Sequence, residues 1–145
     1  MLPEAIELVV VTPERQLARE AVVEVTIPGL EGALGVLPGH APLMTELGIG
    51  ELSYRTGTSS GPISLSVIRG FAEVLANHVT VLAETAERAE EIDVARAEAA
   101  KARAEQRLAS NDTNIDWDRA GIALQRSLIR IQVAKKHHEV PLANH

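Results

Sequence analysis

Cysteine is absent from the 145-residue chain, and its only aromatic residues are Tyr54, Phe71 and Trp117. Without thiols, disulfides and thiolate metal sites are excluded, and a reducing compartment is compatible with the chain. Since 46% of the residues are still apolar, the core must be aliphatic. No apolar run approaches the roughly 20 residues of a membrane-spanning helix, and the N-terminus does not resemble a signal peptide. We therefore expect a soluble, cytoplasmic protein that can still work at a membrane within a larger assembly.

Aspartate is absent from residues 1–84, which carry ten Glu against four Arg, for a net charge of −6. This acidic part argues against nucleic acid as a partner. Residues 85–145 are neutral overall, but their basic side chains gather late, with no acid between Asp118 and Glu139. Such a stretch indicates an acidic partner, a phosphate ligand or a solvated helix face. Its members are Arg119, Arg126, Arg130, Lys135 and Lys136.

Glycine and proline are concentrated in residues 31–47, with apolar side chains between them. Both residue types serve tight turns, glycine by freeing the backbone and proline by fixing it. A segment that is rich in glycine, proline and apolar residues predicts an ordered loop with a defined surface rather than a flexible linker. His40 lies within it, and we expect its imidazole to bond the backbone or an interface rather than a metal.

The first part of the chain has the period-two alternation of half-buried strands. Alternation is clear in residues 22–27 and 63–67, β-branched residues fill 6–11, and a last strand begins near Val79. Turn signals recur at residues 28–29, 47–48 and 56–62 and at Gly70. Many short strands at this spacing predict a sandwich or flattened barrel. A single sheet covered by the helices that follow is the alternative.

The second part has helical character. Residues 92–108 lack Gly, Pro and Thr and are rich in Ala, the best helix former. Small polar residues interrupt the pattern at 110–116, and Asp116 is expected to N-cap a second helix. Spacings of three and four in that helix predict an apolar stripe of Trp117, Gly121, Leu124, Leu128 and Ile131. The fold class is therefore α+β in two segregated parts, an N-terminal β-sandwich followed by a C-terminal antiparallel α-helical hairpin.

An alanine-rich hairpin buries little apolar area when it docks. At about 25 cal/mol per Å², a docked form is expected to be favoured over an extended one by roughly a few kcal/mol. Such an element suits switching between two forms. A hairpin packed permanently on the sheet is the alternative.

Few side-chain patterns in the sequence suggest a catalytic or ligand-binding site. Asp93 and Arg96 can pair across one helical turn, which by itself indicates an ordinary helix start. Arg126 and Arg130 project from one helix face, where two guanidinium groups could hold a phosphate chain or stay solvated. No phosphate-binding loop, nucleophile elbow or zinc-binding histidine pair occurs, so no catalytic residues and no metal site are assigned.

The segment G-A-L-G-V-L-P-G-H-A-P-L at residues 32–43 resembles the signature loop of the epsilon subunit of F-type ATP synthase. The segments G-F-A-E-V at 70–74 and I-D-V-A-R-A at 92–97, together with the helical hairpin, support this resemblance, which covers roughly residues 4–136. It implies three regions: a rotor-binding β-sandwich in residues 1–86, a regulatory hairpin in residues 87–137, and a flexible tail in residues 138–145.

The resemblance implies a non-catalytic rotor subunit of a proton-translocating ATP synthase, with the gamma subunit and the c-ring as partners. It places the protein peripherally on the cytoplasmic face of a bacterial cell membrane, without inserting into it. The loop expected to approach the rotor holds Glu31, Gly32, Ala33, Leu34 and His40. Some relatives carry an acidic residue at the position of Ala33, and Glu31 is the nearest substitute. A free-standing nucleotide-sensing or protein-interaction module is the alternative function.

The hairpin of this family is known in a compact and an extended form. In the extended form its basic second helix meets an acidic segment of the beta subunit and blocks ATP hydrolysis. The resemblance implies that role for Arg119, Arg126, Arg130, Lys135 and Lys136. No cofactor is required, but some bacterial members bind ATP as a regulatory ligand. Carried over by position, the candidate ATP-binding residues are Glu87, Asp93, Arg96, Ala97, Arg126 and Arg130.

Overall fold

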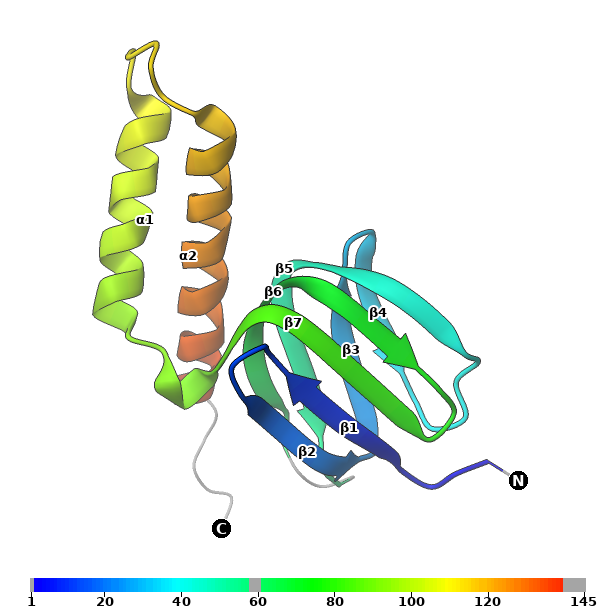
Figure 1. Ribbon diagram of the computed structural model, residues 1–145. Helices are drawn as coiled ribbons and strands as arrows, with labels where there is room; N and C mark the ends of the chain where they lie inside the picture. Colours follow the sequence, from blue (N-terminus) through cyan, green and yellow to red (C-terminus); the bar gives the residue numbers. More distant parts are fainter. Residues whose placement is uncertain (1, 58–60, 140–145) are drawn as a thin grey trace. The chain divides into compact units, whose positions relative to one another are not determined.

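The computed structural model describes residues 2–57 and 61–139, and internal contacts divide the chain into two units, Met1–Arg88 and Ala89–His145. The first unit consists of strands: β1 (Ile6–Val11), β2 (Gln16–Val22), β3 (Glu24–Gly29), β4 (Gly32–Val36), β5 (Leu43–Arg55), β6 (Ile63–Val74) and β7 (His78–Arg88). The second holds the short helix η1 (Ala89–Glu91), α1 (Val94–Ala109) and α2 (Trp117–Glu139) (Figure 1). The predicted fold class is confirmed.

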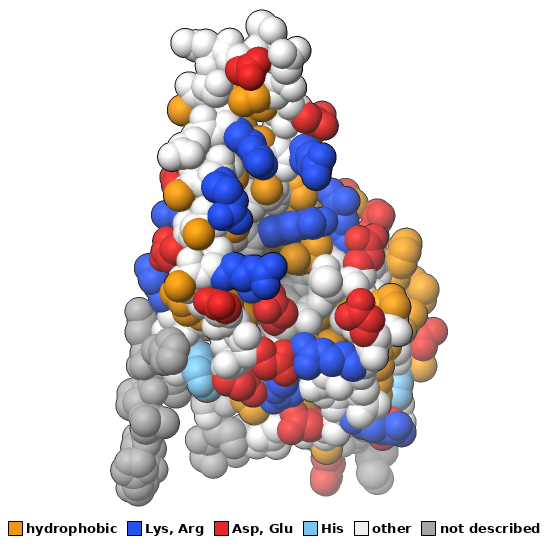
Figure 2. Space-filling view, turned by 60° about the vertical axis from the view of Figure 1, so that its left-hand side comes forward, with side chains coloured by type: hydrophobic (Ala, Val, Ile, Leu, Met, Phe, Trp, Pro, Cys, Tyr) orange, Lys and Arg blue, Asp and Glu red, His pale blue; other side chains and the backbone are white. Residues whose placement is uncertain are grey.

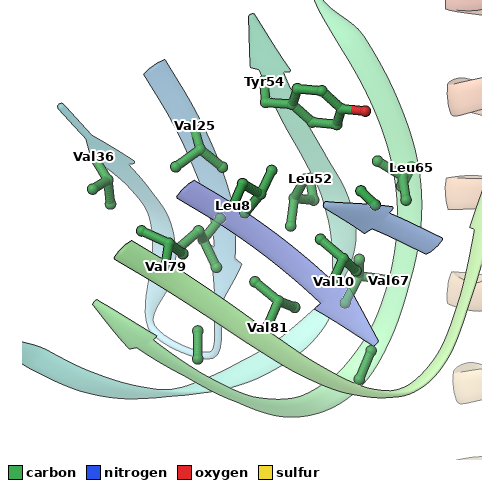
Figure 3. Packing of buried hydrophobic residues seen from close by; sticks show 14 of the residues in the cluster. Leu8, Val10, Val25, Val36, Leu52, Tyr54, Leu65, Val67, Val79 and Val81 are labelled. Carbon is green, nitrogen blue, oxygen red and sulfur yellow. The ribbon is translucent and has the colours of Figure 1, made fainter. Parts of the chain in front are cut away.

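All seven strands belong to one hydrogen-bonded sheet in the order β2-β1-β7-β6-β5-β3-β4. Strands β1 and β7 pair in parallel, and every other neighbouring pair is antiparallel. The sheet folds over itself, so that β1 lies across the core from β3 and β5 (Figure 3). The two layers of the sandwich are therefore parts of a single sheet.

The core between the layers is aliphatic, as the composition requires. Leu8 and Val10 of β1 and Val81 of β7 are fully buried and point toward Leu52 and Leu65 on the facing strands (Figure 3). Tyr54 is the single aromatic side chain among the buried residues of this cluster. Alternate residues of β1 and β7 enter the core, which confirms the predicted period of two.

Two predicted turns are wrong, because β5 runs unbroken through Gly48 and β6 through Gly70. At the second site the backbone has positive φ, 56° at Arg69 and 125° at Gly70, while the register with β5 and β7 is the same on both sides. On β6 the buried side chains change from Leu65 and Val67 before this site to Ala72 and Val74 after it. The glycine allows the strand to bend where a turn was expected.

The helical hairpin begins and turns as predicted. Asp93 caps α1, its Oδ1 accepting from the backbone N–H of Arg96 at 3.0 Å. Asp116 does the same for α2, accepting from the N–H of Arg119 at 3.0 Å. Each cap satisfies a backbone donor that the first helical turn cannot.

The packed face of α2 differs from the predicted stripe. Ile131 is buried, but Trp117 and Leu128 are each 45% exposed. The buried positions also include Ala120 and Ser127, whose small side chains allow the alanine-rich α1 to approach closely. The side chains of Trp117 and Leu128 are too large to fit between the two closely packed helices. The predicted apolar stripe therefore lies beside the surface of α2 that contacts α1. No helix of the described residues is long and apolar enough to cross a membrane.

Candidate functional site

The proposed rotor loop is a two-residue hairpin between β3 and β4. Gly29 pairs with Gly32, so the turn consists of Leu30 and Glu31, two residues later than predicted. Gly32 has φ of 135°, which side-chain-bearing residues rarely adopt. A Cβ on Gly29 would lie 2.7 Å from the carbonyl oxygen of Gly32. Both glycines are therefore needed for the tightness of this turn.

Along β4 the side chains differ in exposure. Glu31, Gly32 and Ala33 are exposed, whereas Leu34 is half-buried and packs against the sandwich core. Strand β4 is the last strand of the sheet beside β3. An edge strand presents backbone N–H and C=O groups outward. A partner could therefore contact these groups of β4 together with the exposed carboxylate of Glu31.

The following loop is held by backbone bonds. Gly39, with φ of 91°, donates its N–H to the carbonyl of Ala76 at 2.7 Å. His40 Nδ1 lies 2.7 Å from the carbonyl oxygen of Ala41, which confirms the expected backbone-bonded imidazole. A bulky residue at 39 would also meet Leu2, since a Cβ there lies 2.6 Å from that side chain.

An exposed apolar surface runs along the neighbouring strands. Phe71 of β6 pairs with Leu82 of β7, and both are 53% exposed. Met44 of β5 is 64% exposed and pairs with Glu73, which is two residues along β6 from Phe71. Leu30, which is 57% exposed, donates its backbone N–H to the carbonyl of Glu46 on β5. Contiguous exposed apolar side chains on a folded domain are typical of a protein–protein contact.

The candidate ATP residues divide between the two units. Glu87 belongs to β7 in the first unit, while the others lie on the hairpin. Asp93 is the α1 cap, Arg96 is exposed, and Ala97 is fully buried. The start of α1 packs against the last turns of α2, through Ile92, Val94, Ile129 and Val133.

On α2, Arg126 precedes the residues of that contact and Arg130 lies between two of them, Ile129 and Val133. Arg126 is exposed and Arg130 is half-buried. The hairpin thus brings their helix segment beside the start of α1. Arg119, Lys135 and Lys136 are exposed on the same helix. Figure 2 shows Lys and Arg side chains gathered along one face of the hairpin.

One buried polar cluster was not foreseen from the sequence. Tyr54 is 1% exposed, and burial, aided by nearby Glu20, raises its pKa to about 12. Glu20 Oε2 and the Tyr54 hydroxyl are buried without a hydrogen-bond partner of good geometry. Arg88, the last residue of β7, lies close by and donates to the carbonyl of Leu17 at 2.6 Å. These residues come from three strands that are distant in the sequence. No pattern of neighbouring residues could therefore have predicted the cluster.

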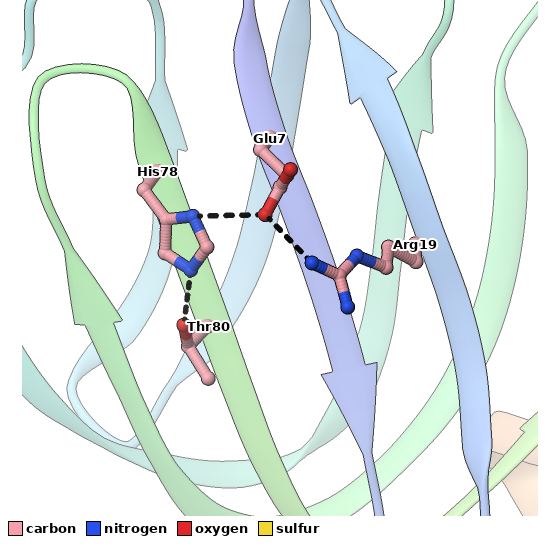
Figure 4. Close-up of polar contacts among 4 residues, drawn as sticks. All are labelled: Glu7, Arg19, His78 and Thr80. Atoms are coloured by element: carbon pink, nitrogen blue, oxygen red, sulfur yellow. Dashed lines mark hydrogen bonds and ion pairs between the residues drawn. The ribbon is translucent and has the colours of Figure 1, made fainter.

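A second polar cluster lies on the outer face of β1, β2 and β7. Glu7 Oε1 lies 3.4 Å from His78 Nδ1 and 3.7 Å from Arg19 Nη2 (Figure 4). His78 Nε2 lies 2.8 Å from Thr80 Oγ1. The carboxylate and guanidinium are about half exposed, so each pair is worth about 0–1 kcal/mol. The cluster supports strand register, and the described residues contain no group of His, Asp and Glu suited to a metal.

Comparison with known families accounts for both units. The model of the ATP synthase Delta/Epsilon chain beta-sandwich domain matches residues 5–89. The model of the ATP synthase Delta/Epsilon chain long alpha-helix domain matches residues 90–135. The chain belongs to the ATP synthase delta/epsilon family. The resemblance found in the loop and hairpin segments is thereby confirmed.

Relatives in this family align along most of their length. The ATP synthase epsilon chain of Syntrophobacter fumaroxidans is 47% identical over 135 residues, covering 93% of this chain and 99% of the relative. That of Solibacter usitatus is 49% identical with the same coverage.

Chains from two solved ATP synthase structures share the fold. A chain of the Euglena gracilis mitochondrial ATP synthase, OSCP/F1/c-ring in rotational state 1, has a TM-score of 0.78 at 25% identity, covering 96% of this chain and 84% of its own. A chain of the Tetrahymena thermophila mitochondrial ATP synthase central stalk/c-ring has a TM-score of 0.54 at 17% identity, covering 91% and 95%. The second likeness concerns the fold alone.

Proposed function

We propose that this chain is a non-catalytic central-stalk subunit of a proton-translocating F-type ATP synthase, in which it helps couple proton flow to ATP synthesis. One observation carries the proposal: the two delta/epsilon domain models match in succession and together span residues 5–135. The gamma subunit and the c-ring are the proposed partners, on the cytoplasmic face of the membrane. The Euglena chain comes from an F1/c-ring assembly, which supports this choice.

The strand unit supplies the proposed rotor contact. Its edge turn presents the Glu31 carboxylate with Gly32 and Ala33 exposed beside it. The apolar strip of Met44 and Phe71 supports a second contact, because its side chains would leave water on docking. Glu31 takes the place of the acidic residue that some relatives carry at position 33.

The hairpin supplies the proposed regulation. In an extended form, the basic face of α2 would meet an acidic segment of the beta subunit and inhibit ATP hydrolysis. Its cations are Arg119, Arg126, Arg130, Lys135 and Lys136. Charge complementarity between exposed groups gives such a contact specificity and a fast association rate, and makes it salt-dependent.

ATP is the proposed regulatory ligand of the hairpin, bound by Glu87, Asp93, Arg96, Ala97, Arg126 and Arg130. The packing of the α1 start against the second half of α2 supports this choice. Arg126 and Arg130 are four residues apart, and an anion between them would relieve their mutual repulsion. The ligand would favour whichever hairpin form holds these groups together.

Reconstitution with the remaining synthase subunits tests the stalk role. The full chain is expected to restore proton-coupled ATP synthesis and to lower ATP hydrolysis. A variant with glutamine at the five basic α2 positions should restore coupling but not inhibition. A complex that couples and hydrolyses equally well without the chain would exclude the proposal.

Calorimetric titration of the isolated chain with MgATP tests the regulatory ligand. The double variant Arg126→Ala, Arg130→Ala should lose the binding heat. Lys101→Ala, which removes one cation from the other helix, should retain it. Absence of heat at millimolar ATP would reject nucleotide binding while leaving the stalk role intact. Binding of ATP without any effect in the reconstituted complex would favour a free-standing sensor.

A further inference from the structure

A cavity of about 500 Å³ lies at the hairpin turn, where it is lined by residues of the α1 end, the connecting loop and the first turn of α2. A second cavity of about 370 Å³ adjoins it and shares Arg107 and Ile115. Both hollows are open to solvent, so a ligand there would be held at the surface of the hairpin turn. The residues that line them carry the charges described next.

Three arginine residues line these two cavities. Arg107 and Arg119 border the larger one, from the last turn of α1 and the first of α2, and Arg103 borders the smaller. Within the part of the chain that the structure describes, none of the three side chains has an ion pair or a hydrogen bond. Arginine forks of this kind suit the planar oxygens of phosphate and carboxylate groups.

The carboxylates of the larger cavity are already engaged by the backbone. Asp112 Oδ1 accepts from the N–H of Asn114 at 2.9 Å, and Asp116 Oδ1 accepts from the N–H of Arg119 at 3.0 Å. Both therefore shape the turn and cap α2. Neither forms an ion pair with Arg107 or Arg119, although all four side chains line the same cavity.

The first turn of α2 borders the larger cavity through Asp116, Arg119 and Ala120. Asp116 satisfies the N–H of Arg119, and its carbonyl accepts from Ala120. The amides of Trp117 and Asp118 precede these and have no partner within the helix. The 23-residue length of α2 gives it a full dipole, which favours an anion at this end.

We propose that the cavity at the hairpin turn binds the phosphate group of a small phosphorylated ligand, held by Arg107 and Arg119 with Arg103 at its border. The site is distinct from the proposed ATP contacts at Asp93. Arg107 lies fourteen positions after Asp93 in the sequence, about 20 Å along the helix. A ligand bridging Arg107 and Arg119 would clamp the end of α1 to the start of α2.

The test uses the full chain labelled with ¹⁵N, titrated with inorganic phosphate and, separately, with ATP, against sodium chloride of equal ionic strength. Phosphate is expected to shift the amide signals of residues 112–120 more than chloride does. Arg107→Ala and Arg119→Ala should each weaken binding about tenfold, since each removes a charge-assisted contact. Lys101→Ala should bind like the parent, because Lys101 lines neither cavity.

The two phosphate sources give different results. Saturation by inorganic phosphate assigns the site to a single phosphate group, and shifts of residues 112–120 by ATP alone assign it to a nucleotide phosphate. ATP shifts confined to residues near Asp93 would overturn the turn site while supporting the other. Equal shifts by chloride, or unchanged binding in both alanine variants with their helical circular dichroism intact, would also overturn it.

Discussion

Gly70 lies against the backbone of the neighbouring strand so closely that a Cβ at this position would come within 2.0 Å of the carbonyl oxygen of Leu82. Its φ of 125° is also one that side-chain-bearing residues avoid. Steric fit and backbone conformation thus both require glycine. The bend that glycine permits here lets β6 bury Leu65 and Val67 before this position and Ala72 and Val74 after it.

Gly70→Ala is therefore expected to lower the free energy of unfolding of the strand unit by about 3 kcal/mol or more, combining backbone strain with a backbone clash. Denaturant unfolding followed through the single tyrosine, Tyr54, reports on this unit alone. Gly35→Ala is the matched control, because a Cβ there meets nothing within 4 Å. Equal stability of the two variants would contradict the role given to Gly70.

Asp93→Ala removes the α1 cap and is expected to destabilise the hairpin by about 1 kcal/mol. Thermal unfolding measured by helical circular dichroism and Trp117 fluorescence checks it. Asp93→Asn should recover most of the loss, since the amide oxygen can still accept from the N–H of Arg96. If Asn restores the helix but not MgATP binding, the carboxylate has a second role in the ligand site. A drop of equal size in both variants would show that capping is not what Asp93 contributes.

Tyr54 should ionise in a single step near pH 12, measured by phenolate absorbance, because it is the only tyrosine. The folded pKa lies above the ordinary value of 10.0, so the fold favours the neutral hydroxyl. The stability from this preference is complete below pH 10 and is lost as the pH rises toward 12. Tyr54→Phe should abolish that part of the alkaline loss. An ionisation at the ordinary pKa in the folded chain would refute the buried environment.

Truncation after Arg88 should leave the strand unit folded, with its β-type circular dichroism retained, because the core of Leu8, Val10 and Leu65 lies within this unit. Truncation after Glu84 should be less stable, since it removes the buried Ala86 and the Arg88 bond to Leu17. Comparing the two unfolding midpoints measures the contribution of the last four residues. Loss of structure in the longer fragment would show that the strand unit depends on the hairpin.

The sequence predicted those features that local chemistry determines. Alternation located the buried residues of the strands, alanine content located α1, and Asp116 was correctly assigned as a cap. The backbone role of His40 also followed from its glycine- and proline-rich surroundings. The division at 86/87 and the 138–145 tail stay predictions. Residues 140–145 lie outside the described chain, and α2 ends at Glu139.

Features that depend on distant neighbours could not be predicted. Gly48 and Gly70 looked like turn residues, but the reason for Gly70 is the approach of Leu82 from another strand. The stripe through Trp117 and Leu128 was misplaced because the partner helix is lined with alanine. The arginine cavity joins Arg107 and Arg119 across a loop, and nothing in the spacing of either residue indicates the other.

The parallel pairing of β1 with β7 has a consequence for synthesis of the protein in the cell. The first strand cannot gain its inner partner until residue 82 has left the ribosome, so an edge of the sheet stays open during most of translation. Closing so long a loop is slow compared with forming local hairpins. We expect the nascent strand unit to need shielding from aggregation, with the hairpin segment serving as the tether that carries it clear of the exit tunnel.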